Sequence, residues 1–123
     1  MHEITDHQTN ELNKAIKVVA DDRSEETGGS YQYDVFIKSG DGPLLALETF
    51  MFQNGPVQEF GINGLTNEVL LAIVIDRLRG FLSGPFTCRE NAMALMKLEE
   101  GLMWLQARTR DRIARGVEDT YQK

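Results

Sequence analysis

The chain has 123 residues, of which 41% are hydrophobic and 26% are charged, and its formal net charge at pH 7 is −6. This length fits one small domain with an adequate core. The acidic balance argues against non-specific binding of nucleic acid. The single cysteine, Cys88, excludes an internal disulfide and a cysteine-rich metal site. There is no run of ~18 apolar residues and no signal-peptide pattern, so we expect a cytosolic protein that makes no membrane contact.

The charge is distributed unevenly along the chain. Residues 1–65 contain eleven acidic and four basic side chains, whereas residues 66–123 contain eight acidic and nine basic side chains. Any site for an anionic ligand is therefore expected in the second half of the chain.

The first half is predicted to form a small antiparallel sheet. Residues 9–23 show the apolar spacing of a short helix. Residues 31–38 alternate between apolar and polar side chains, as a half-buried strand does, and residues 44–53 and 57–62 read as two further strands. The turns that separate the strands are short, which favours an antiparallel meander. A meander of this size needs a helix or a partner to cover one face.

The second half is predicted to form a helical hairpin. Its first helix follows Thr66 as the N-cap and ends at Gly84-Pro85. Its second helix starts with a capping box made by Thr87 and Glu90, and it runs to about Ala114. A helix of that length, ~40 Å, outruns so small a domain, and we expect it to pack against a second copy of the chain.

The predicted architecture is therefore α+β. We expect one domain over residues 1–123, made of a helix and meander at about 1–62, a helical hairpin at about 63–116 and a tail at 117–123. Oligomerisation through the helices would bury the two-sided apolar surface of the first of them.

The sequence contains no recognisable catalytic constellation. Phosphate-binding glycine loops, zinc-protease motifs and the serine-hydrolase elbow are all absent. Cys88 precedes a helix, but no histidine is placed to activate it, and the role of a buried small apolar residue explains it more simply. We expect a protein that is not an enzyme, with no catalytic residue, no metal and no cofactor.

The strongest candidates for binding are arginines and the corner of the hairpin. Arg108, Arg112 and Arg115 recur at helical spacing and suit phosphate, although a solvated helix end that compensates the helix dipole explains them equally well. Phe81 could stack on a base, and Asn91 could hydrogen-bond to its edge. Asn91 and Arg108 are 17 residues apart, roughly 25 Å along a helix. They can form one site only if two subunits contribute to it.

Three segments carry a family resemblance. NGLTNEVLLAIVIDRLRGF (63–81), SGPFTCRENAMAL (83–95) and LEEGLMWLQARTRDRIARGVE (98–118) together resemble the phage Thoeris anti-defence sponge family, type one, over roughly residues 53–120. The family shares its helical-hairpin domain with anti-CBASS sponges.

The resemblance implies a function and a site. It implies a phage protein in the cytoplasm of the infected bacterial host that sequesters TIR-derived glyco-cyclic ADP-ribose isomers without cleaving them. The pocket would lie between two subunits of a homodimer or of a higher oligomer such as a hexamer. Phe81 would stack on adenine, Asn91 would hydrogen-bond, and Arg108 and Arg112 would engage the base face and the pyrophosphate; Arg115 is added from its spacing. Some relatives also bind cyclic di- or trinucleotides at separate sites.

A second hypothesis stays open on the residues. The apolar first helix and the long second helix would also suit an oligomeric module that inhibits a host protein by direct contact. A nucleotide hydrolase ranks last, because carboxylates at metal-ligand spacing are not recognisable.

Overall fold

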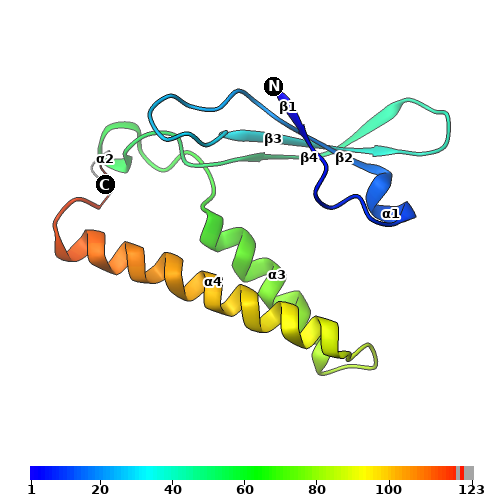
Figure 1. Ribbon diagram of the computed structural model, residues 1–123. Helices are drawn as coiled ribbons and strands as arrows, with labels where there is room; N and C mark the ends of the chain where they lie inside the picture. Colours follow the sequence, from blue (N-terminus) through cyan, green and yellow to red (C-terminus); the bar gives the residue numbers. More distant parts are fainter. Residues whose placement is uncertain (119, 121–123) are drawn as a thin grey trace. The chain divides into compact units, whose positions relative to one another are not determined.

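The computed structural model describes residues 1–118 and 120. Within them, an antiparallel sheet at the N-terminus is followed by helices, the last of which is long (Figure 1), and the α+β prediction is confirmed. The chain divides into two compact units: residues 1–54 with 60–64, and residues 55–59 with everything from residue 65 onward. No helix in the described part of the chain is long and apolar enough to cross a membrane. The single domain expected from the sequence stays a prediction.

The first unit is a four-stranded antiparallel meander. Its strands are β1 (His2–Ile4), β2 (Ile16–Ala20), β3 (Gln32–Lys38) and β4 (Leu44–Met51), and they lie in the sheet in that order. The predicted strands at 31–38 and 44–53 are therefore confirmed as β3 and β4. A register shift between Val35 and Phe36 marks a bulge in β3.

The helix predicted over residues 9–23 is wrong. Only one turn of helix, α1 (Glu11–Lys14), forms there, capped by Asn10, and residues 16–20 form β2. Three of the five residues of β2 are β-branched, which favours a strand. Because β2 is paired with β1 on one side and β3 on the other, long-range pairing overrides the helical spacing of the apolar residues.

The strand predicted over residues 57–62 is also wrong. Residues Val57–Phe60 form a one-turn helix, α2. Proline favours the first turn of a helix, and Pro56 stands directly before this one, accepting a hydrogen bond from Glu59 N at 3.1 Å. Gly61, with φ of 70°, follows α2 in the left-handed region that ends helices.

Two asparagines close the loop around α2. Asn54 N donates to Asn63 Oδ1 at 2.8 Å, and Asn63 Nδ2 donates to the Asn54 carbonyl at 2.8 Å. Gly64 comes next, where a β-carbon would lie 2.4 Å from the carbonyl carbon of Phe52. Only glycine fits this close approach of two backbone segments.

The first helix of the predicted hairpin is confirmed. It is α3 (Asn67–Leu82), and Thr66 is its N-cap: the Thr66 side chain accepts a hydrogen bond from Val69 N at 3.2 Å. Ser83 is the C-cap, directly before the predicted stop at Gly84-Pro85.

The second helix is confirmed as α4 (Arg89–Ala114), but its predicted cap is one residue off. Cys88, rather than Thr87, has the extended backbone of an N-cap, and its sulfur accepts a hydrogen bond from Asn91 N at 3.4 Å. Glu90 is therefore the second residue of α4 and not the third, which a capping box requires. Cys88 is exposed, so the buried apolar role expected for it is wrong. At the other end Gly116, with φ of 72°, stops the helix as predicted.

The helices α3 and α4 pack side by side as a hairpin (Figure 1). Ile75 of α3 is only 2% exposed, and the ion pair of Arg79 with Glu99 at 2.7 Å links the two helices. The half-buried leucines of the hairpin are Leu70, Leu71, Leu78, Leu82, Leu95, Leu98, Leu102 and Leu105. With 26 residues against 16, α4 continues beyond the start of α3 (Figure 1).

Candidate functional site

The hairpin corner places Phe81 and Asn91 on either side of one short link. Phe81 lies in the last turn of α3, and Asn91 lies in the first turn of α4. The Phe81 side chain is 38% exposed, which leaves part of its ring available for stacking. The local stop and start signals of the two helices therefore fix both residues at the same end of the hairpin.

The amide of Asn91 is only partly used by the protein. Its Nδ2 donates to the carbonyl of Phe86 at 3.4 Å, a long and therefore weak hydrogen bond. Within residues 1–118 and 120, its Oδ1 has no hydrogen-bond partner. An acceptor oxygen held at the hairpin corner can pair with the amino group of a base.

Phe81 also has a neighbour that the sequence analysis missed. The guanidinium carbon of Arg77 lies 5.0 Å from the centroid of the Phe81 ring, which is the geometry of a cation–π contact. Arg77 precedes Phe81 by four residues on α3, so the spacing of the two could have indicated the contact.

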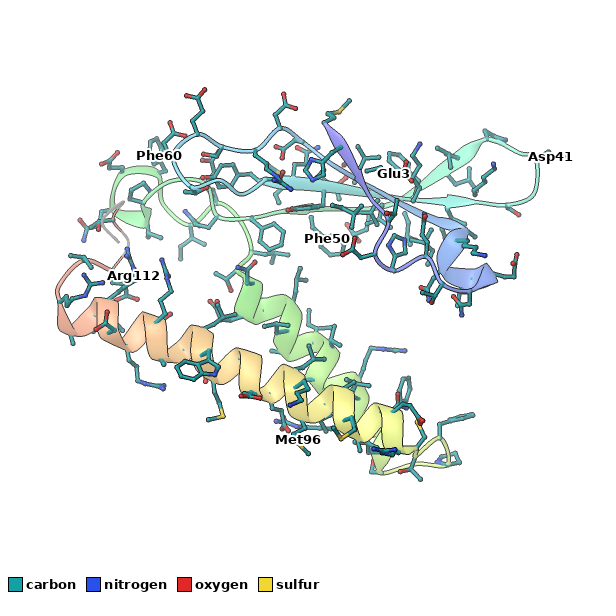
Figure 2. All side chains as sticks on the ribbon, in the orientation of Figure 1. Glu3, Asp41, Phe50, Phe60, Met96 and Arg112 are labelled. Carbon is teal, nitrogen blue, oxygen red and sulfur yellow. The ribbon has the colours of Figure 1, made fainter. Side chains whose placement is uncertain are left out.

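The three arginines near the end of α4 have three different environments. Arg108 is exposed, and it has no hydrogen bond or ion pair with any residue that the structure describes. Arg112, labelled in Figure 2, is 7% exposed, and its Nη2 donates to the carbonyls of Val117 at 2.9 Å and Thr120 at 3.0 Å. Arg115 forms an exposed ion pair with Asp111 at 3.0 Å. Of the three, Arg108 is the arginine with an open guanidinium.

The two groups of predicted residues do not meet within one chain. Asn91 and Arg108 both belong to α4, and the 17 residues between them correspond to about 25 Å along a helix. Phe81 lies at the Asn91 end. A small ligand that touches both groups therefore needs an arginine from another copy of the chain.

A shallow depression of about 360 Å³ lies elsewhere on the hairpin. Its lining comes from Glu68, Gln106, Thr109 and Arg110, and it includes none of the predicted ligand-binding residues. In the described part of the chain, no group of three or more histidine, cysteine or acidic side chains lies close enough together to hold a metal ion.

The side of α4 that faces away from α3 carries exposed large apolar side chains, here called the apolar stripe, around the exposed carboxylate of Glu100. Its large side chains are Met93, Met96, Met103 and Trp104, and Trp104 is 71% exposed. On an ideal helix these four span an arc of about 100°, opposite the half-buried leucines, and Met96 projects from α4 in Figure 2. Arg108 follows Trp104 by four residues and therefore borders this apolar stripe.

The fold and the site together define a helical-hairpin protein that has stacking and hydrogen-bonding groups at its corner and arginines near the end of its long helix. Residues 48–110, about half of the chain, match the family model described as Acb2/Tad1, hairpin domain. The chain belongs to this family, and the resemblance seen in the sequence is confirmed at that level.

A curated relative supports the same assignment. The chain is 58% identical over 77 residues to "Thoeris anti-defense 1" of Bacillus phage SBSphiJ7, an alignment that covers 63% of this chain and 54% of the relative. The chain thus spans about half the length of the relative that it matches.

Proposed function

We propose that this chain is a phage anti-defence protein that binds and sequesters TIR-derived glyco-cyclic ADP-ribose isomers without cleaving them, in the cytoplasm of the infected bacterium. Membership of the Acb2/Tad1 hairpin family carries the proposal. The relative named for Thoeris anti-defence, 58% identical over 77 residues, supports the defence system concerned. Removal of the messenger would leave the defence effector inactive.

The corner supplies the groups that recognise the base. Phe81 stacks on the adenine through its exposed part, and Asn91 Oδ1 accepts a hydrogen bond from the exocyclic amine. Both groups act on the ground state of the ligand, and neither has to activate water. Such a site retains its ligand and does not hydrolyse it.

Part of the charge that balances the pyrophosphate comes from a second subunit. Arg108 has an open guanidinium, and arginine forks bind phosphate bidentately. In an antiparallel pairing of two α4 helices, Arg108 of one subunit approaches Asn91 of the other, and two identical pockets form across the two-fold axis. Arg112 and Arg115 complete the basic end of the helix, and direct contact of Arg112 with the ligand would require exchange of its bonds to Val117 and Thr120.

The apolar stripe on α4 supports this pairing. Met93, Met96, Met103 and Trp104 are exposed in the single chain around Glu100, and large apolar side chains that gather on one helix face are typical of a protein–protein contact. Because Arg108 borders the stripe, a subunit that covers the stripe also receives Arg108 at its edge. The assembly is a dimer or a higher oligomer such as a hexamer.

Calorimetric titration with glyco-cyclic ADP-ribose tests the function. The wild type is expected to bind, Phe81→Leu to lose most of the affinity, and Phe86→Leu to bind as the wild type does. Phe86 is a matched control because it is an exposed aromatic of the same corner. Heat denaturation of the complex should release the intact messenger, whereas a cleaved product would identify an enzyme.

The same titration should include cyclic di- and trinucleotides, which we propose as further ligands at separate sites. Their binding should survive Phe81→Leu.

The apolar stripe also allows the second hypothesis, direct inhibition of a host protein. Absence of nucleotide binding, together with a stoichiometric complex with one host protein, would replace the sponge by that mechanism.

A further inference from the structure

The contact between Arg77 and Phe81 has a consequence for the pocket. The guanidinium carbon of Arg77 lies 5.0 Å from the ring centroid, and both side chains are exposed. The five N–H donors of a guanidinium lie in its plane, so an arginine that contacts a ring through its flat face directs these donors past the ring. It can therefore hold the ring and donate hydrogen bonds at the same time.

The two arginines of α3 differ in what they bind. Arg79 is paired with Glu99 at 2.7 Å, which neutralises it and ties α3 to α4. Arg77 has no ion pair with any described carboxylate, and its contact is the Phe81 ring. Of these two cations, Arg77 is the one with its charge available to an anion.

The need for such a charge follows from the other end of the hairpin. A pyrophosphate carries two negative charges, and Arg112 already donates to two backbone carbonyls of its own chain. Arg108 alone offers an open guanidinium among the three arginines near the end of α4. A second arginine without an ion pair, next to the stacking ring, would balance the second negative charge of the pyrophosphate.

We propose that Arg77 is a phosphate-binding residue of the nucleotide pocket, donating to the pyrophosphate of the ligand whose base stacks on Phe81. This inference rests on the proposed function. A cyclic ligand holds base and pyrophosphate in one compact molecule, so one corner can contact both. Arg77 occupies one face of the ring, which leaves the opposite face and the ring edge for the base.

Two substitutions test the role of Arg77 by calorimetry with glyco-cyclic ADP-ribose at several salt concentrations. Arg77→Met keeps the length of the side chain and removes its charge, and it should weaken binding about 10- to 100-fold, as the loss of a charge-assisted hydrogen bond does. It should also reduce the salt dependence of the affinity, because the complex then has one fewer ionic contact that salt can screen. Arg77→Lys keeps the charge and should retain the salt dependence with part of the affinity.

Arg79→Met is the matched control. It removes the same charge from the same helix, two residues away, and its exposed ion pair contributes little to stability. Its binding should equal that of the wild type. An equal loss with Arg79→Met would show a general charge effect and overturn the proposal.

Two other results would also overturn it. Wild-type affinity in Arg77→Met would exclude any contact. A weakened affinity with unchanged salt dependence would show that Arg77 only holds the Phe81 ring in place.

If the wild type binds and Phe81→Leu does not, the proposed function stands whichever way Arg77 behaves; failure of the wild type to bind removes both. Circular dichroism of each variant confirms that it is folded, as expected for substitutions of exposed residues.

Discussion

The Nη2 atom of Arg112 donates a hydrogen bond of 2.9 Å to the carbonyl oxygen of Val117, five residues further along the chain. The same atom donates to Thr120 at 3.0 Å, and the hydroxyl of Thr120 donates to the Val117 carbonyl at 2.6 Å. Arg112 therefore satisfies the carbonyls of Val117 and Thr120, two residues beyond the end of α4, and ties them to the helix end.

Replacement of Arg112 should therefore lower stability. Arg112→Met removes a nearly buried guanidinium and leaves two carbonyls without this donor, at a cost of about 1–3 kcal/mol in the free energy of unfolding. Chemical denaturation measures the change. The control is Arg115→Met, whose exposed pair with Asp111 should contribute no more than about 0.5 kcal/mol. Equal effects of the two substitutions would contradict the bracing role of Arg112.

A second stability prediction concerns Gly64. A β-carbon there would lie 2.4 Å from the Phe52 carbonyl carbon and 2.6 Å from the carbonyl oxygen of Met51. Both of these are backbone atoms, which cannot move without disturbing the end of β4 and the hydrogen bonds between Asn54 and Asn63. Gly64→Ala should cost about 2 kcal/mol or more in the free energy of unfolding.

Gly101→Ala is the matched control for Gly64→Ala. In α4 a β-carbon at Gly101 meets nothing within 4 Å, and alanine should stabilise the helix by about 1 kcal/mol. Thermal unfolding of both variants should therefore shift in opposite directions. A shift in the same direction would mean that a partner subunit packs against Gly101.

The helical hairpin could be predicted because its boundaries are set by local chemistry. Thr66 caps α3, Gly84-Pro85 follows its end, and Gly116 stops α4 in the left-handed region. Each of these signals acts within one turn of the backbone, so a single sequence contains it.

The wrong helix at 9–23 falls where tertiary contacts decide the structure, whereas Pro56 and Gly61 are local signals that the strand prediction at 57–62 overlooked. Residues 9–23 have apolar side chains at helical spacing, yet β2 forms there because β3 pairs with it from a distance in the chain. The helical spacing of Arg108, Arg112 and Arg115 fits α4 and its C-cap, and their role in ligand binding stays a prediction. The hydrogen bonds of Arg112 to the carbonyls of Val117 and Thr120 could not be predicted, because helical spacing carries no information on residues beyond the end of the helix.

The apolar stripe gives a prediction about assembly. Trp104→Glu replaces the largest apolar side chain of the stripe with a second carboxylate beside Glu100, and it should shift the protein to a smaller species and weaken messenger binding at least tenfold, because the pocket needs two subunits. Light scattering coupled to gel filtration measures the mass. Ile113→Glu is the control, since Ile113 is exposed on another side of α4, and it should leave the mass unchanged. A Trp104→Glu protein with wild-type mass would move the interface away from the stripe.

A mixing experiment tests whether each pocket combines two chains. Phe81→Leu and Arg108→Met should each bind the messenger poorly, because the first lacks the stacking ring and the second lacks the partner's open guanidinium. Equal amounts of the two variants are unfolded together and reassembled, so that chains pair at random. A pocket is complete when the Arg108→Met chain supplies Phe81 and the Phe81→Leu chain supplies Arg108. This combination arises in one of the four possible pairings. Calorimetry should then find about a quarter of the pockets restored to wild-type affinity. Random pairing gives the same fraction in a dimer and in a hexamer, so the result does not depend on oligomer size.

Mass spectrometry of the intact complex confirms that the variants have mixed. A mixed complex that binds no better than its components would place Phe81 and Arg108 in the pocket of the same chain, or Arg108 outside it, and the two-subunit site would be abandoned.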